Sequence, residues 1–187
     1  MSTNRKTIKT FGNCRVIHFY GEINEKMGRE CINRLIHLDK KSNKDILLVI
    51  DSIGGDVDVI VSIYQVIQLL RCKVGTLCLS NANSAAAILL ACGEPGKRMV
   101  MAQSIVMLHD ISSEFNKDYH SVLENEINSL RLSRTIINNM LKDHGAENAI
   151  KFIKPEATYL CGEDIVKNKL ADIVVKKLDD ILKVVKI

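Results

Sequence analysis

Residues 77–109, LCLSNANSAAAILLACGEPGKRMVMAQSIVMLH, decide the fold that we expect for this chain. An apolar run ends in a small polar turn that carries Ser84, and an alanine-rich helix follows immediately. A second apolar run then ends at His109. A strand, a turn, a helix and a second strand in this order can present a serine and a histidine at the same edge of a sheet.

Composition places the chain among soluble globular proteins with a core of ordinary size. Its 187 residues predict one domain, and 47% of them are hydrophobic and 26% charged. The net charge of +4 comes from scattered lysines and arginines rather than from a basic stripe. We therefore expect no nucleic-acid partner.

Hydropathy and cysteine usage narrow the cellular context. No apolar run reaches the roughly 18 residues that cross a bilayer, and the first residues, MSTNRKTIKT, lead into no apolar segment. We expect no membrane partner, no secretory signal and a cytoplasmic location. Six cysteines form no CxxC pair and lie mostly in apolar runs, at positions 14, 31, 72, 78, 92 and 161. This pattern predicts small buried residues in a reducing compartment, with no disulfide framework, no metal site and no cofactor.

The turn residues and the spacing of apolar residues predict strands that alternate with helices as far as His109. The expected strands cover residues 14–20, 45–50, 74–79, 99–101 and 105–108. The expected helices cover residues 24–40, with Asn24 as the N-terminal cap, 57–71 and about 83–92. Such an alternation is typical of βαβ units, so the expected fold class is α/β with a mostly parallel sheet covered by helices.

A long helix expected at residues 121–144 departs from this alternation. It either wraps the core or projects to meet a partner, and the sequence leaves both alternatives open. Shorter helices are expected at residues 146–153 and 163–168, a last strand at 173–176 and an amphipathic tail at 179–187.

Three features can carry chemistry, and each also has an ordinary structural explanation. Ser84 at the mouth of a helix can act as a nucleophile beside N–H groups that hold an oxyanion, but serine is also a common helix cap. The amides of Gly54 and Gly55 after a buried strand can donate to an oxyanion, or the pair can simply form a tight turn. His109, followed by Asp110, can be a general base or a partly exposed residue at a strand end.

Taken together, the order strand, Gly-Gly turn, helix, strand, serine, helix, strand, histidine resembles the Clp protease proteolytic subunit family along nearly the whole chain. The matching segments are RVIHFYGEI (15–23), DILLVIDSIGGDV (45–57), GKR (96–98), SIVMLH (104–109) and the region 160–172. The separation of Ser84 and His109, 109 − 84 = 25 residues, also suits that family.

The resemblance implies a crotonase-like α/β fold in a single domain, with a β-α spiral head at about 11–110 and 155–187 and a handle helix within about 111–154. It also implies a homo-oligomer of two stacked heptameric rings, with an AAA+ unfoldase that feeds unfolded proteins or peptides into the chamber. The activity that it implies is that of a serine endopeptidase. In such an enzyme Ser84 attacks the scissile carbonyl, and His109 takes the serine proton as general base. The oxyanion donors would be the amides of Gly54, Gly55 and Ala85.

The chain departs from the family pattern at the third catalytic position. Ala157 stands where the family has an aspartate, and the neighbouring Glu156 is the substitute that we expect to orient His109. Leu47 and Val49 replace aromatic residues that help members of the family to bind the ATPase. Two alternatives therefore stay open. One is a catalytically weak or inactive structural ring subunit, and the other is an acyl-CoA enzyme of crotonase type, for which the chain is short.

Overall fold

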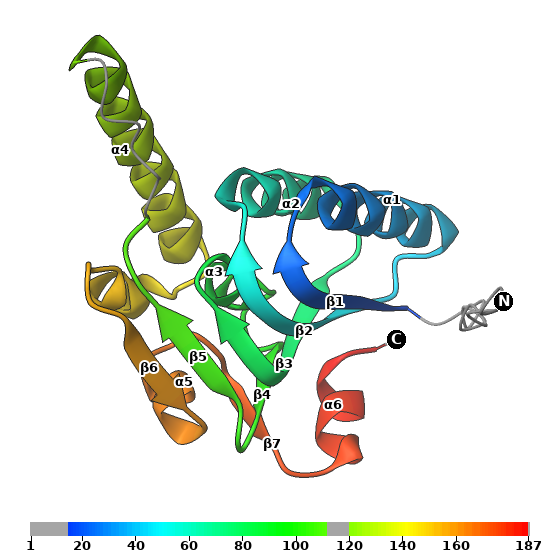
Figure 1. The fold of residues 1–187 in the computed structure, drawn as a ribbon. Coiled ribbons are helices and arrows are strands. Elements are labelled where there is room, and N and C mark those ends of the chain that lie inside the picture. Colours follow the sequence, from blue (N-terminus) through cyan, green and yellow to red (C-terminus); the bar gives the residue numbers. More distant parts are fainter. Residues whose placement is uncertain (1–14, 112–119, 187) are drawn as a thin grey trace, which may run out of the picture.

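A seven-stranded sheet forms the centre of the computed structural model, which describes residues 15–111 and 120–186 (Figure 1). The strands are β1 (Val16–Ile23), β2 (Ile46–Gly55), β3 (Val74–Asn83), β4 (Arg98–Met101), β5 (Ile105–Leu108), β6 (Thr158–Cys161) and β7 (Ile173–Val175). The main path runs β1-β2-β3-β4-β7, and β5 pairs with β3 and with β6. Every pairing is parallel except that of β5 with β6. The predicted α/β class with a mostly parallel sheet is confirmed.

Strand β3 changes its partner along its length. Residues 76–78 pair with residues 98–100 of β4, whereas residues 81–83 pair with residues 105–107 of β5. Strands β4 and β5 therefore follow one another along the same edge of β3, and β5 ends beside the end of β3. Because β3 and β5 run parallel, Ser84 and His109 emerge at the same edge of the sheet.

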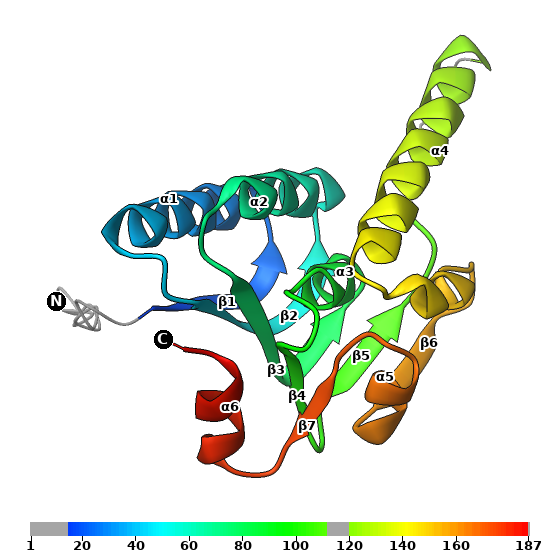
Figure 2. The same ribbon diagram turned by 180° about the vertical axis from the view of Figure 1, so that it is seen from behind.

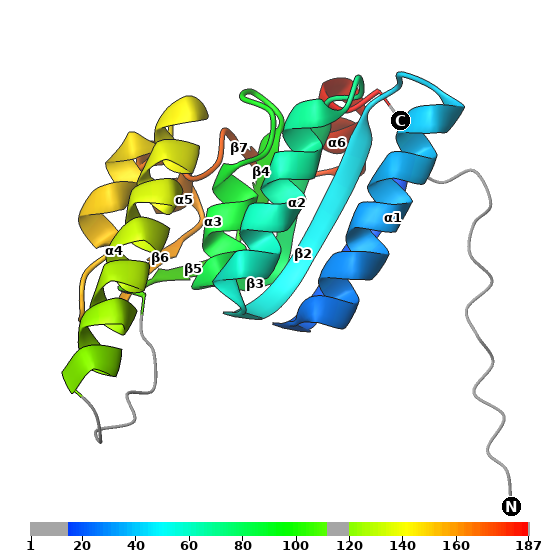
Figure 3. The same cartoon turned by 90° about the horizontal axis from the view of Figure 1, so that it is seen from above.

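Helices α1 (Glu25–Lys41), α2 (Val57–Leu69) and α3 (Ala85–Ala91) cover one face of the sheet (Figure 3). Asn24 caps α1 as predicted, since its side chain accepts a hydrogen bond from the N–H of Met27 at 3.1 Å. Every residue of α3 is buried. Successive side chains of a strand point to opposite faces, so Leu48 and Ile50 of β2 join the core beneath these helices.

The opposite face of the sheet is covered by α6 (Leu178–Val184) and the residues that follow it. Leu47 and Val49 of β2 are only 4% and 5% exposed and pack in one cluster with Val185. The N–H of Lys186 donates to the carboxylate of Asp45 at 2.9 Å, and the N–H of Asp45 donates to the carbonyl of Lys186 at 3.2 Å. Leu47 and Val49, for which the resemblance implies aromatic residues in the family, thus lie beneath the C-terminal segment.

Helix α4 (His120–Asp143) extends away from the body of the molecule (Figures 1 and 2). Near its C-terminal end Ile137, Met140 and Leu141 are buried in the main core, whereas none of the described side chains from 124 to 136 is buried. Of the two alternatives for this helix, the structure has the projecting one. A 3₁₀ helix, η1 (Glu147–Phe152), and the short α5 (Glu163–Lys167) follow.

Several element boundaries differ from the prediction. Strand β6 was not expected, β2 and β3 continue to Gly55 and Asn83, and residues 147–152 form a 3₁₀ rather than an α-helix. The continuation of β2 has a physical reason, because β1 keeps pairing with it beyond an irregularity between Tyr20 and Glu22. Residues 1–14 and 112–119 lie outside the described part. The division into a head and a handle therefore stays a prediction.

Candidate active site

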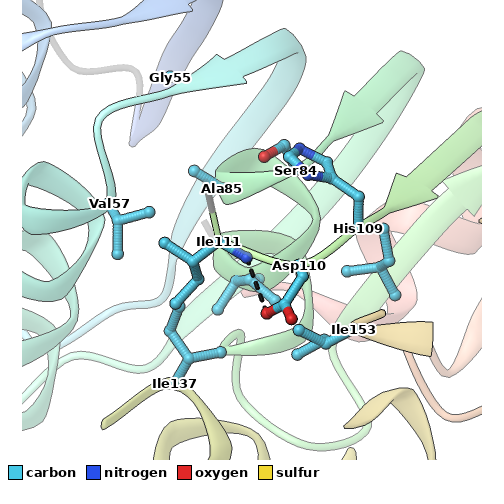
Figure 4. A pocket seen from close by; sticks show the side chains of 11 residues that line it. Gly55, Val57, Ser84, Ala85, His109, Asp110, Ile111, Ile137 and Ile153 are labelled. Atoms are coloured by element: carbon cyan, nitrogen blue, oxygen red, sulfur yellow. Dashed lines mark hydrogen bonds between the residues drawn. The ribbon is translucent and has the colours of Figure 1, made fainter. Parts of the chain in front are cut away.

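A small pocket of about 100 Å³ opens where β3 and β5 end (Figure 4). Four of the residues that line it are ones that the sequence analysis selected, namely Gly55, Ser84, Ala85 and His109. Most of the remaining wall is apolar and consists of Val57, Ile88, Leu108, Ile111, Ile137 and Ile153. Asp110 completes the lining. The structure thus brings most of the predicted site residues to one cavity.

Ser84 has a backbone conformation that serine rarely adopts. Its φ of 54° and ψ of −122° lie outside the common regions for residues with a side chain. Ser84 occupies the N-cap position of α3, yet its side chain makes no capping hydrogen bond. Its main chain is fixed instead, because the Ser84 N–H donates to the carbonyl of Met107 at 2.7 Å. The ordinary explanation of this serine as a helix cap therefore fails, and its hydroxyl is free to face the pocket.

His109 lines the same pocket as Ser84. Figure 4 shows the side chains of both residues there. Between these two described residues no hydrogen bond is formed. The hydrogen bond between a nucleophile and its general base is often long or absent in an enzyme without substrate and forms only in the complex. The arrangement of Ser84 and His109 therefore suits a serine and its general base.

Gly54 makes room for the Ser84 turn, and Gly55 makes room for the neighbouring strand β1. A Cβ atom at Gly54, where φ is 94°, would lie 2.6 Å from the carbonyl oxygen of Asn83 and 2.8 Å from the Cβ of Ser84. At Gly55, where φ is 144°, a Cβ would collide with the main chain of Ile23. Glycine is therefore the residue that fits at both positions.

The two glycine amides differ in what they can donate to. The N–H of Gly54 already donates to the hydroxyl of Ser52 at 3.1 Å, and Gly54 does not line the pocket. Gly55 and Ala85 do line it, beside Ser84. Among the three predicted oxyanion donors, these two have positions that suit a carbonyl oxygen bound in the pocket.

The predicted third catalytic residue, Glu156, lies elsewhere. It is exposed, precedes β6 and is not among the residues that line the pocket. The antiparallel ladder of β5 and β6 ends at the pair Leu108–Thr158, and extending its register by one residue would set His109 opposite Ala157. Side chains directly opposite each other in such a ladder share a face. Position 157, which holds an alanine, is therefore the position that this register brings closest to His109, although Ala157 itself is exposed and does not line the pocket.

Other nucleophiles and metal chemistry have little support in the described residues. Burial raises the pKa of Cys31 and of Cys92 to about 12 and that of Cys78 to about 11, so these thiols stay protonated. Cys161 is exposed, so the prediction of buried cysteines is wrong there. Residues 15–111 and 120–186 contain no group of three or more His, Cys, Asp or Glu side chains that could hold a metal ion.

Some pocket residues were not found from the sequence. Ile137 comes from α4 and Ile153 from the segment after η1, and both are far from Ser84 along the chain. Apolar residues at helical spacing carry no signal that separates a pocket wall from a core. Asp110 had one usable signal, its position directly after His109.

Comparison with known proteins identifies the family. The protein family described as "Clp protease" matches residues 2–177 of the chain. An "ATP-dependent Clp protease proteolytic subunit" of Carsonella ruddii is 43% identical over 95 residues, which are 51% of this chain and 49% of that protein. A "proteolytic subunit 1" of Corynebacterium glutamicum is 32% identical and covers 72% of this chain and 65% of its own length. A "proteolytic subunit 2" of Streptomyces coelicolor is 31% identical, and the match covers 89% of this chain and 78% of that protein.

The matches cover only part of the length of two of these relatives. The matched region spans about half the length of the Carsonella protein and 65% of the Corynebacterium protein. In the described part of the chain, no helix has the length and hydropathy needed to cross a membrane. Because the family description matches most of the sequence, the predicted resemblance is confirmed: the chain belongs to the Clp protease family.

Proposed function

We propose that this chain is a serine endopeptidase that hydrolyses peptide bonds of unfolded proteins or peptides. One observation carries the proposal: Ser84 holds a strained backbone conformation and keeps its hydroxyl free beside His109. Strain of about 1–3 kcal/mol persists at a residue only when the surroundings impose it, and it is commonest at functional sites. The relatives, all of which are named as proteolytic subunits, support the same activity.

The proposed reaction uses groups that already face the pocket. The Oγ of Ser84 attacks the carbonyl carbon of the scissile bond, and His109 accepts its proton. The N–H groups of Gly55 and Ala85 donate to the oxyanion that forms. The protonated His109 then gives its proton to the leaving amine, and water hydrolyses the acyl-serine with His109 again acting as base.

The wall of the pocket favours an apolar substrate side chain. Val57, Ile88, Ile137 and Ile153 are branched aliphatic residues, and the cavity of about 100 Å³ is small. Apolar surface that leaves water on binding contributes about 25 cal/mol per Å², so a medium-sized aliphatic side chain fits this site best. A charged side chain there would lose its hydration, and the carboxylate in the wall, that of Asp110, is already bound by Arg134 and by the N–H of Ile111.

Assembly into a ring chamber is part of the proposal. The projecting helix α4 carries exposed apolar side chains at Ile127, Leu132 and Ile136, which would be covered by contact with a second subunit. The name "ATP-dependent" of the relatives favours an AAA+ unfoldase as a further partner. The face at Leu47 and Val49 is closed by the C-terminal segment, so such a partner would bind elsewhere or displace that segment. A cytoplasmic location fits this function.

A fluorophosphonate probe tests the activity, because it labels only an activated serine. Intact-mass measurement should find one probe on each wild-type chain, no probe on Ser84→Ala and strongly slowed labelling of His109→Ala. Wild-type protein that stays unlabelled, or Ser84→Ala that is labelled as fast as wild type, would refute the proposed function.

The second candidate is a structural ring subunit that cleaves nothing. It is favoured by Ala157, which stands where the family resemblance implies the carboxylate that orients the base. This candidate predicts a stable oligomer by light scattering together with no hydrolysis of small apolar peptides. Peptide cleavage that disappears in Ser84→Ala would eliminate it.

A further inference from the structure

The residue after His109 is tied to the projecting helix by a hydrogen-bonded ion pair. Nη1 of Arg134, on α4, donates to Oδ2 of Asp110 at 2.6 Å. Nη2 of the same side chain donates to the carbonyl oxygen of Ile153 at 2.8 Å. One guanidinium therefore joins α4 to two separate segments of the body, and both segments line the pocket.

Asp110 is fixed by two more hydrogen bonds. Its N–H donates to the carbonyl of Lys154 at 2.8 Å, and its Oδ1 accepts from the N–H of Ile111 at 2.9 Å. Both carboxylate oxygens are thus engaged, and in Figure 4 the carboxylate points away from the imidazole. Asp110 therefore acts on the main chain that carries His109 rather than on the ring itself.

This ion pair has little to contribute to overall stability. The side chains of Arg134 and Asp110 are 43% and 27% exposed, and exposed ion pairs contribute about 0–1 kcal/mol. What the pair offers is geometry, because a planar guanidinium directs its N–H groups along fixed lines. Alignment of the neighbouring base explains the contact better than stability does.

The position of Arg134 along α4 is also informative. Ile137, one turn closer to the body, is 2% exposed, whereas Leu132 on the projecting side is 65% exposed. Arg134 therefore lies where the helix leaves the body. A change in the tilt of α4 would pass through Arg134 to Asp110 and so to the residue beside it.

We propose that Arg134 and Asp110 are positioning residues for His109, so that the alignment of the base depends on how α4 is seated on the body. The proposal rests on the serine endopeptidase function proposed above. It fits the described pocket around His109, in which the carboxylate, that of Asp110, is held by Arg134 and by the N–H of Ile111. The main chain at Asp110 then supplies the anchor that an orienting carboxylate would otherwise provide.

The test is steady-state hydrolysis of a fluorogenic apolar peptide by the full-length protein. Arg134→Met removes the donors but keeps the stem, and we expect kcat to fall about tenfold with KM unchanged within about twofold. Asp110→Asn should lower kcat in the same way. Arg134→Lys should have a kcat between those of Arg134→Met and wild type. An ammonium keeps the charge but lacks the two N–H groups that reach Oδ2 of Asp110 and the carbonyl oxygen of Ile153 at once. Arg131→Met, an exposed position on the same helix, is the matched control.

Melting temperature and elution volume should match wild type in every variant, which separates positioning from unfolding. The proposal is wrong if Arg134→Met keeps the wild-type kcat, or if Arg131→Met loses as much. It is also wrong if kcat falls only in variants that melt at lower temperature. Wild type that shows neither peptide turnover nor probe labelling at Ser84 would reject the proposed function and this inference with it. An active wild type with an equally active Arg134→Met rejects the inference alone.

Discussion

Two turns of this molecule have nearly the same backbone conformation and different residues. Strand β3 leads through Ser84, with φ 54° and ψ −122°, into α3. Strand β6 leads through Gly162, with φ 48° and ψ −118°, into α5. Glycine adopts such angles without steric strain, whereas serine does not. At position 162 the chain uses the residue that suits the turn, and at position 84 it does not.

The difference shows what is particular to the turn at Ser84. A Cβ atom at Gly162 would lie 2.7 Å from the carbonyl oxygen of Ala102, so the second turn excludes a side chain. The first turn accommodates one because Gly54, which faces it, has none. The Ser84 turn thus combines a strained serine with a glycine that makes space for it, beside His109. Strain kept where glycine would relieve it points to a use for the hydroxyl.

The largest effect is expected from giving the strained serine a better base. Ala157→Asp places a carboxylate at the position that the extended register of β5 and β6 would set opposite His109, and we expect it to hold the imidazole in the orientation and tautomer that accept a proton from Ser84. Loss of such a carboxylate lowers kcat by about 10⁴ in serine proteases with the chymotrypsin-type triad. We therefore expect kcat for an apolar peptide to rise on the order of 10²-fold, a part of that factor, because the surrounding site was not shaped around an aspartate.

Ala157→Asn is the control for this gain, since it has the same shape without the charge. A rate for Ala157→Asp that does not exceed that of Ala157→Asn would show that the residue at position 157 does not limit the base.

A smaller effect, on stability, is expected when the turn at Gly162 is given a side chain like the turn at Ser84. Gly162→Ala combines an unfavourable φ with a collision against the carbonyl of Ala102, and should lower the free energy of unfolding by about 2 kcal/mol. Gly96→Ala is its control, because Gly96 has a φ of 83° but no atom within 4 Å of its Cβ position. Urea unfolding at a fixed protein concentration compares the two. Equal losses would mean that the turn at 162 has more room than the structure gives it.

The smallest effect concerns the far end of the helix that leaves the Ser84 turn. Nη1 of Arg98 donates to the carbonyl of Ala91 at 3.2 Å, and the Asp172 carboxylate binds the same guanidinium at 2.9 and 2.6 Å. Burial by itself would raise the pKa of Asp172, but the hydrogen bonds and charge of Arg98 outweigh it, and the pKa is lowered. A lowered pKa stabilises the fold above the pKa of the unfolded chain, about 3.9, and this contribution is lost as pH falls through the folded value.

Acidification below about pH 4 should therefore lower the free energy of unfolding, and less steeply in Asp172→Asn than in wild type. Asp179→Asn, at an exposed position of α6, should keep the wild-type slope. Urea unfolding at neutral and acid pH measures both slopes. Identical slopes for wild type and Asp172→Asn would contradict the role given to this ion pair.

Much of the fold was predictable because its signals are local. The Asn24 cap, the buried β2 and the alternation of strands and helices follow from patterns within about ten residues, and the structure has each of them. Strand β6 was missed because its four residues are paired only through β5, about fifty residues earlier, and the pairing is not visible in the segment itself.

The candidate site was predictable in its chemistry but not in its geometry. Ser84 and His109 could be selected from their places after two strands. The φ of Ser84 could not, because a serine before a helix is equally typical of a cap. The ion pair between Asp110 and Arg134 joins residues 24 positions apart through a helix whose orientation the sequence leaves open.

The most direct test of the role of Ser84 is to replace it with glycine, the residue that occupies the equivalent position, 162, in the turn between β6 and α5. Ser84→Gly should raise the free energy of unfolding by about 1 kcal/mol, because the strain is relieved, and should abolish fluorophosphonate labelling, because the hydroxyl is gone. Ser84→Ala keeps the Cβ and the strain, and should lose labelling without gaining stability. A Ser84→Gly protein that is no more stable than wild type, or that still reacts with the probe, would contradict the conclusion that this strain is kept for a nucleophile.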